Sequence, residues 1–272
     1  DSVWHRLWPK KSVNIVNMDG LEWKRSKYNS ITRRFLRHAE RLAAKHADVL
    51  VADSIPIREY LLEKYNKNAR FIAYCAPVFE TPDSNFIKTL PIQPSQYFLA
   101  IARMEPENNF EMIIKGWLAS GSQLPLVITG NTNNRYGRML TKKYQQAGII
   151  FTGPIYDRAI LDNLRHHSLL YFHGHSVGGT NPSLLEAMGC GCSIAAHDNT
   201  FNKAILGTDA AYFLNSTDIT NIILLQQPES LLLNRRMANQ EKVKTIYTTE
   251  AIADAYETLM YESLAAKNKT SG

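Results

Sequence analysis

The most informative stretch of this sequence is His173-Gly-His-Ser-Val-Gly-Gly-Thr-Asn-Pro-Ser-Leu-Leu-Glu-Ala-Met-Gly189. It follows an apolar run that we expect to be a buried strand, and it continues into a helix. Gly178 and Gly179 allow positive φ and a close approach of the backbone. Backbone N–H groups and the positive end of the helix dipole would then point out of the strand's carboxyl end. This is a geometry that binds phosphate.

The helix in this stretch carries its own start signals and one carboxylate. Thr180 or Asn181 can cap it, and Pro182 suits its first turn. Glu186 lies four residues after Pro182, on the same face about one turn deeper. A carboxylate there can accept hydrogen bonds from both hydroxyls of a ribose, so the stretch predicts a nucleoside diphosphate site. The alternative is a tight strand–helix turn with Glu186 solvated.

The rest of the chain alternates strands and helices, which predicts a doubly wound α/β architecture. The expected strands are 13–18, 49–52, 97–102, 126–129, 149–152, 169–173 and 193–196. The expected helices are 31–47, 55–65, 110–120, 138–147, 158–166, 182–188 and 250–265, with Asp53 or Ser54 capping the second.

A proline-rich segment at 74–94 indicates a linker between domains. We expect a first domain at 1–76, a Rossmann-like nucleotide-binding domain at 77–249, and a closing helix with a tail at 250–272. Only about two strands are expected before Pro77, and the chain starts at Asp1 without an initiator methionine. The first domain is therefore expected to be truncated.

Composition excludes some classes of protein. The chain has 272 residues, of which 44% are apolar and 21% charged, as in soluble globular proteins. No apolar run approaches the ~20 residues that a membrane-spanning helix needs. Cys75, Cys190 and Cys192 form no disulfide framework, zinc knuckle or Cys-x-x-Cys motif, so we expect small buried residues.

Positive charge is concentrated between Lys24 and His46, where eight Lys or Arg residues, Lys27 among them, accompany a single acidic residue, Glu40. Such a segment can be a solvated helix face, a contact for anionic lipid headgroups or a nucleic-acid patch. Aromatic residues are not interleaved as nucleic-acid stacking requires. Trp4 and Trp8 add to the case for a membrane surface.

The segment Asn181-Pro-Ser-Leu-Leu-Glu-Ala-Met188 resembles the donor-site signature of family-4 retaining glycosyltransferases. The resemblance extends over residues 13–262. It implies the GT-B fold, an α/β architecture with a Rossmann-like C-terminal donor domain and here an incomplete N-terminal Rossmann-like acceptor domain. The family usually carries Glu-x7-Glu in this loop. Glu186 is the second Glu, but Gly178 stands at the first position, where His175, Ser176 or a backbone amide would have to substitute.

Ala102-Arg-Met-Glu-Pro-Glu-Asn-Asn109 resembles a second family motif. Arg103 matches an Arg that grips the leaving diphosphate in the family. The family's Lys is replaced by Asn108, which should weaken the positive field at the diphosphate unless another cation helps, and Arg135 and Lys203 are candidates.

Two further loops fit the family pattern, although either could be a simple turn. Gly130 and Asn131 correspond to the loop that lines the sugar and phosphate. Ile155 and Tyr156 lie in Gly153-Pro-Ile-Tyr-Asp157, where the backbone reads the base.

The segments 17–25 and 47–54 resemble the acceptor domain of bacterial rhamnosyltransferases. Asp19 takes the position of a His that faces the donor sugar in many relatives. The alternative is a turn in which Asp19 is a capping residue.

The resemblance implies a retaining, metal-independent hexosyltransferase in which Asp19, Arg103 and Glu186 are catalytic. The donor would be a nucleoside diphosphate sugar, dTDP-rhamnose by resemblance, with no further cofactor. The acceptor would be a glycan or lipid-linked glycan of the cell surface, which places the protein in the cytoplasm, on the inner membrane face. No Asp-x-Asp motif is present, and we expect core or loop roles for the histidines His166, His167, His173 and His175.

Three other classes stay open. The first is a non-catalytic nucleotide-sugar-binding fragment that needs a partner domain, favoured by the half-kept Glu-x7-Glu. The second is a nucleotide-sugar epimerase with the same fold, whose acid and base would come from His173 and His175. A nucleic-acid-binding protein is the most distant.

Overall fold

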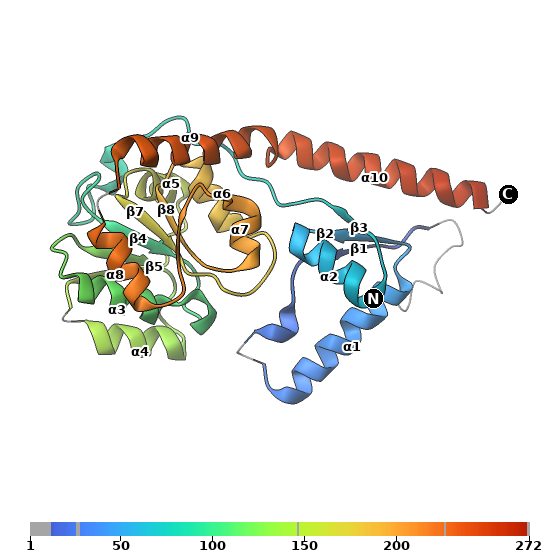
Figure 1. The fold of residues 1–272 in the computed structure, drawn as a ribbon, viewed down its shortest axis with the longest axis horizontal. Helices are drawn as coiled ribbons and strands as arrows, with labels where there is room; N and C mark the ends of the chain where they lie inside the picture. The colour runs from blue at the N-terminus through green and yellow to red at the C-terminus, as the bar shows by residue number, and fades with distance from the viewer. Residues whose placement is uncertain (1–11, 26–27, 146, 226, 271–272) are drawn as a thin grey trace. The chain divides into compact units, whose positions relative to one another are not determined.

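A computed structural model describes residues 12–25, 28–145, 147–225 and 227–270. The chain forms two compact units (Figure 1). Unit 1 comprises residues 1–75, 177–181 and 247–272, and unit 2 comprises residues 76–176 and 182–246. The loop 177–181, which the sequence analysis singles out, groups with unit 1 although both of its neighbours in the chain belong to unit 2.

Unit 1 contains a three-stranded parallel sheet in the order β1-β2-β3. Its elements are β1 (Ile15–Met18), α1 (Ser30–His46), β2 (Val49–Ala52), α2 (Ile55–Tyr65), β3 (Ala69–Phe71) and α10 (Thr249–Thr270). The expectation of about two strands was wrong, because β3 has only three residues and too little pattern to be recognised. Val51, Ile72 and Leu259 form its buried core, so α10 packs on this sheet.

Unit 2 is a parallel sheet in the order β6-β5-β4-β7-β8-β9. The strands are β4 (Phe98–Ile101), β5 (Leu126–Thr129), β6 (Ile149–Gly153), β7 (Leu170–His173), β8 (Ile194–His197) and β9 (Ala211–Phe213). The direction of winding reverses between β4 and β7. In open α/β sheets this switch point, at the carboxyl ends of the strands, is where ligands bind.

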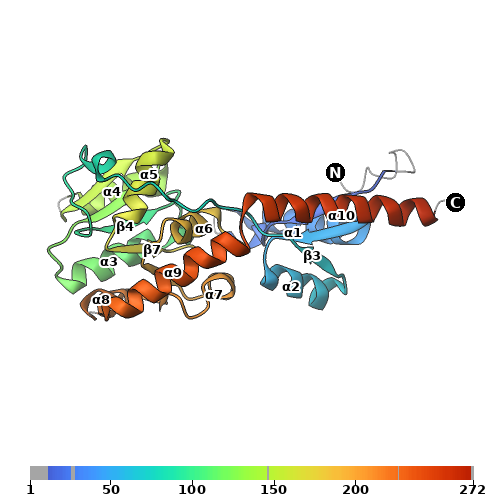
Figure 2. The same cartoon turned by 90° about the horizontal axis from the view of Figure 1, so that it is seen from above.

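Helices cover both faces of this sheet (Figures 1 and 2). They are α3 (Phe110–Ser120), α4 (Arg135–Tyr144), α5 (Arg158–His166), α6 (Pro182–Gly189), α7 (Thr200–Leu206), α8 (Ser216–Leu224) and α9 (Glu229–Thr245). The sequence analysis missed β9, α7, α8 and α9, and it placed α4 three residues too late. The helix α4 starts early because Asn134 caps it, accepting a 2.7 Å hydrogen bond from the backbone of Gly137.

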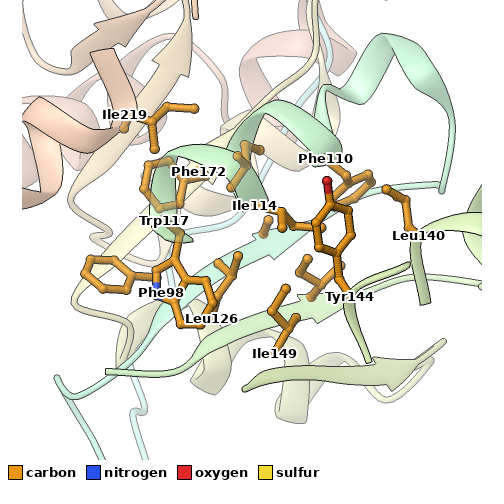
Figure 3. Packing of buried hydrophobic residues seen from close by; sticks show 14 of the residues in the cluster. Phe98, Phe110, Ile114, Trp117, Leu126, Leu140, Tyr144, Ile149, Phe172 and Ile219 are labelled. Atoms are coloured by element: carbon orange, nitrogen blue, oxygen red, sulfur yellow. The ribbon is translucent and has the colours of Figure 1, made fainter. Parts of the chain in front are cut away.

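One buried cluster of unit 2 lies between the sheet and the helices α3, α4 and α8 (Figure 3). Phe98, Trp117 and Phe172 are among its buried residues. A Cβ at Gly116 would lie 2.5 Å from Cβ of Ile219, so α3 and α8 can pack this closely only because Gly116 has no side chain.

The three cysteines are free thiols. Cys190 and Cys192 are buried as expected, whereas Cys75 is exposed, which corrects the expectation for that residue. Within the described part of the chain, no helix has both the length and the apolar composition needed to cross a membrane.

Candidate functional site

The predicted donor-site residues of unit 2 lie on loops at one edge of its sheet. Arg103 follows β4, Gly130 and Asn131 follow β5, Ile155 and Tyr156 follow β6, and His175 follows β7. Because all six strands are parallel, their carboxyl ends meet at this same edge. The loops after β4 and β7 leave the sheet on either side of the switch point.

The loop after β7 is fastened to the loop after β4. A Cβ at Gly174 would lie 2.0 Å from the carbonyl oxygen of Asn108, so only glycine allows this approach. Asn108 Oδ1 lies 2.9 Å from Nδ1 of His175. The backbone amide and hydroxyl of Ser176 both donate to the carbonyl of Glu107, at 3.0 and 2.9 Å. These contacts hold the predicted phosphate loop in one position.

Asn108 occupies the position where the resemblance expects a Lys, and its role in the structure is positional. Its side chain is buried, and Nδ2 donates a 2.7 Å hydrogen bond to the carbonyl of Arg103. Asn108 therefore joins the two loops but supplies no charge. The Arg103 side chain is 65% exposed and has Glu105 at 3.8 Å, a loose pair that leaves its guanidinium accessible.

The two candidate replacement cations differ in their surroundings. Lys203 on α7 forms a 2.7 Å ion pair with Asp198, which compensates its charge. Arg135 is the exposed first residue of α4, the helix that follows β5, and so belongs to the same edge of the sheet as Arg103.

His173 is buried at the end of β7, and among the described residues its Nε2 has no hydrogen-bond partner. Burial, reinforced by His175 and His197, holds its pKa well below the usual value, so the ring is neutral near pH 7. Within the described part of the chain, no group of three or more His, Cys, Asp or Glu side chains is arranged to hold a metal ion.

Glu186 on α6 is partly exposed, and one of its carboxylate oxygens is paired within the protein. Its Oε2 lies 2.5 Å from Nη2 of Arg165, a buried residue of α5. Arg165 also pairs with Asp162 at 2.9 Å. The sequence analysis missed Arg165, because its spacing from Glu186 carries no motif. The only signal was an Arg on the inner face of a predicted helix.

In unit 1, the loop 177–181 contacts Asp53, which directly follows β2. The backbone amide of Thr180 donates to Oδ2 of Asp53 at 3.0 Å, and the Thr180 hydroxyl donates to the Asp53 carbonyl. A Cβ at Gly179 would lie 2.0 Å from Oδ1 of Asp53, so the glycine is required here. The expectation that the Thr180 amide is free for phosphate is thereby corrected, since a carboxylate of the protein occupies it.

Asp53 is a functional candidate that the sequence analysis treated only as a helix cap. Its pKa is raised to about 7, chiefly by burial and also by the nearby charge of Asp19. The hydrogen bond from the Thr180 amide opposes the shift. Ser54, not Asp53, occupies the N-cap position of α2.

Asp19 follows β1, and the register that pairs Met18 with Ala52 puts Asp19 and Asp53 at neighbouring strand ends. Burial, together with the nearby carboxylates of Asp19 and Asp53, raises the pKa of Tyr74. Gly20, at φ +148°, lies against Gly178 and Gly179. Unit 1 thus brings together Asp19, a second carboxylate and the glycine pair of the loop.

Comparisons with known proteins identify two family matches along the chain. Residues 9–77 match a family described as a domain of unknown function, DUF1972, and residues 83–235 match the family described as glycosyl transferases group 1. A search of curated proteins finds no match.

Several solved structures share the fold. HepE of Anabaena, in complex with UDP, is 14% identical to this chain and superposes with a TM-score of 0.78. The match covers 97% of this chain and 75% of the HepE chain. Sucrose-phosphate synthase from Thermosynechococcus elongatus is 16% identical to this chain, with a TM-score of 0.74. The match covers 93% of this chain and 68% of the synthase chain. TarM is 14% identical with a TM-score of 0.70, covering 92% of this chain, which spans only 50% of TarM. The match to residues 83–235, more than half of the chain, shows that it belongs to the glycosyl transferases group 1 family.

Proposed function

We propose that this chain binds a nucleoside diphosphate sugar and transfers the sugar to an acceptor hydroxyl. The observation that carries the proposal is the convergence at the switch point of unit 2. Arg103 after β4, the loop after β7 and Glu186 on α6 belong to the same edge of one parallel sheet. The solved complexes of HepE with UDP and with UDP-glucose, which have the same fold, support this choice of ligand.

The proposed roles follow from the chemistry of each group. Arg103 supplies a fixed positive charge to the diphosphate as the bond between sugar and phosphate breaks. The positive end of the helix dipole of α6 adds to that field. Glu186 accepts a hydrogen bond from a hydroxyl of the nucleotide's pentose, which in a dTDP sugar is the 3′-hydroxyl of deoxyribose. By the resemblance, Asp19 is assigned to the sugar and the incoming hydroxyl. The protein thereby stabilises charge without a bound metal ion.

The finer assignments rest on the resemblance of the segments 17–25 and 181–188. From it we propose dTDP-rhamnose as the donor, retention of the anomeric configuration, and a role in cell-surface polysaccharide synthesis. Gly130, Asn131, Ile155 and Tyr156 would contact the sugar, the phosphate and the base.

We further propose that the acceptor is a glycan or lipid-linked glycan reached at the cytoplasmic face of an anionic membrane. The support is the surface of α1, where Ile31 and Phe35 are 79% and 67% exposed beside the exposed Arg34, His38 and Arg41. Apolar and basic side chains on one exposed face suit an anionic lipid surface. Trp4, Trp8 and Lys27 lie outside the described residues.

Flotation with vesicles of anionic and of neutral lipid tests the membrane proposal. We expect binding to anionic vesicles only, and weaker binding of Phe35→Ser, with the exposed Leu62→Ser on α2 as the matched control. Equal binding to both kinds of vesicle, or none, would contradict the proposal.

The first test of the donor proposal is thermal stabilisation by dTDP, UDP, GDP and ADP without added metal. A nucleotide present at about 100 times its Kd stabilises the folded protein by ~2.7 kcal/mol, which a melting curve detects. We expect one nucleotide to stand out, and Glu186→Ala to weaken its binding by ~1–3 kcal/mol. A chain stabilised by none of the four would contradict donor binding. Product analysis with and without an acceptor then separates a transferase from an epimerase.

A further inference from the structure

Arg165 is a deeply buried charged side chain beside α6, the helix that carries Glu186. It lies on α5, and its side chain is only 3% exposed. A guanidinium removed from water costs several kcal/mol unless carboxylates and hydrogen bonds compensate it. The surroundings of Arg165 therefore indicate what its charge is for.

The guanidinium of Arg165 pairs with two carboxylates, one through each terminal nitrogen. Nη1 donates to Oδ1 of Asp162 at 2.9 Å, one turn earlier on α5, and Nη2 donates to Oε2 of Glu186 at 2.5 Å. Nη2 also lies 3.5 Å from the hydroxyl of Ser183 on α6. Asp162 is itself buried, and its other oxygen pairs with Arg158 at 3.3 Å. Asp162 thus fixes the orientation of Arg165, and Arg165 connects α5 to α6.

The two oxygens of Glu186 are in different situations. Oε2 is held by Arg165, whereas no hydrogen bond to Oε1 is found among the described residues. The Glu186 side chain is 34% exposed, in contrast to its partner. A carboxylate anchored through one oxygen cannot rotate away, so the other oxygen keeps a constant direction.

We propose that Arg165 is a positioning residue for sugar-nucleotide binding, which holds Glu186 by one oxygen so that the other accepts a ribose hydroxyl. This inference rests on the proposed function and deepens it, because it assigns the support of the ribose contact to a residue that does not touch the nucleotide. Because Arg165 already fixes the Glu186 side chain in the folded protein, its rotamer entropy is lost on folding. Nucleotide binding then carries no such cost, which favours affinity.

The test compares affinity for two nucleotides. One is whichever of dTDP, UDP, GDP and ADP binds the wild type most tightly, and the other is its 2′,3′-dideoxy counterpart. Their Kd ratio isolates the ribose contact from the contacts of base and diphosphate. The wild type should prefer the natural nucleotide by about tenfold or more, the effect of hydrogen bonds to a charged group.

In Arg165→Met the ratio should fall to near one while affinity for the dideoxy nucleotide is kept. Arg158→Met, which contacts Asp162 but not Glu186, is the matched control and should keep the wild-type ratio. Arg165→Lys, whose single ammonium cannot hold both carboxylates, should give an intermediate Kd ratio. If Arg165→Met does not fold, the ratio of Arg165→Lys tests the proposal in its place.

A wild-type ratio in the folded Arg165 variants, or equal weakening of both nucleotides, would overturn the proposal and assign Arg165 a purely structural role. If Glu186→Ala removes the preference and the Arg165 variants do not, only this inference fails. If the wild type binds the nucleotide without any preference for the ribose hydroxyls, the assigned role of Glu186 fails with it.

Discussion

Replacing Asp53 by Asn should change how the stability of the protein depends on pH. Asp53 is buried, and its pKa is raised from 3.8 to about 7 in the folded chain. The folded state therefore binds more protons than the unfolded state between these two values. Stability then falls as pH rises through that window, and it is constant above the folded pKa.

The magnitude follows from the size of the shift. About three pKa units at ~1.4 kcal/mol each amount to ~4 kcal/mol, which the ionised Asp53 costs the folded protein above its folded pKa. The neutral amide introduced by Asp53→Asn would remove this cost and could still accept the hydrogen bond from the Thr180 amide. The new amide N–H group would be buried without a partner, which destabilises the folded variant by ~1–3 kcal/mol at every pH. We expect a net gain of ~1–3 kcal/mol at neutral pH.

Urea denaturation of wild type and Asp53→Asn at several pH values from about 4 to about 8 measures this difference. The gain in the free energy of unfolding should grow by up to ~1.4 kcal/mol per pH unit across the window and then level off. Asp254→Asn, at an exposed position on α10, is the control and should show no such slope. Parallel curves for wild type and Asp53→Asn would refute the reasoning.

Three other predictions concern single residues. Glu40, buried on α1, accepts hydrogen bonds from Trp23, Tyr60, Tyr65 and Lys64, and these donors lower its pKa against the effect of burial. Glu40→Gln should therefore lose ~2–4 kcal/mol of unfolding free energy at neutral pH, and less in acid, where the carboxyl of Glu40 in the wild type is protonated. Equal losses at both pH values would argue against an ionised Glu40. Gly116→Ala should lower stability by ~1–3 kcal/mol through overpacking against Ile219, and an unchanged melting temperature would show that α3 and α8 can separate at no cost. Gly130→Ala, whose Cβ would lie 2.2 Å from the carbonyl oxygen of Ala102, should weaken nucleotide binding by displacing the loop after β5, which titration calorimetry can measure.

Much of unit 2 could be predicted from the sequence, because its elements carry strong local signals. The strand at Leu126–Thr129 and the helices at Phe110–Ser120 and Arg158–His166 agree with the expected bounds. These segments have buried apolar runs or helical periodicity over several turns. The strands Ala69–Phe71 and Ala211–Phe213 were missed because three residues carry too little pattern.

The candidate site divides in the same way. A strand–turn–helix at 173–189 could be predicted from the sequence alone. Its glycines, its proline and Glu186 indicate it through local preferences. The pairing of Arg165 with Glu186 joins residues 21 apart, and the bond from the Thr180 amide to Asp53 joins residues 127 apart.

The sequence by itself determined the fold class and the loop on which the proposed donor site is built, because φ preferences, helix starts and hydrophobic periodicity act between residues close in the chain. Only the tertiary structure decided which partners those residues have. A carboxylate or amide in the sequence does not specify which buried group compensates it. That choice is made when strands with distant sequence positions come together and exclude water, since a buried charge or N–H must then find its partner among the groups that packing has placed nearby.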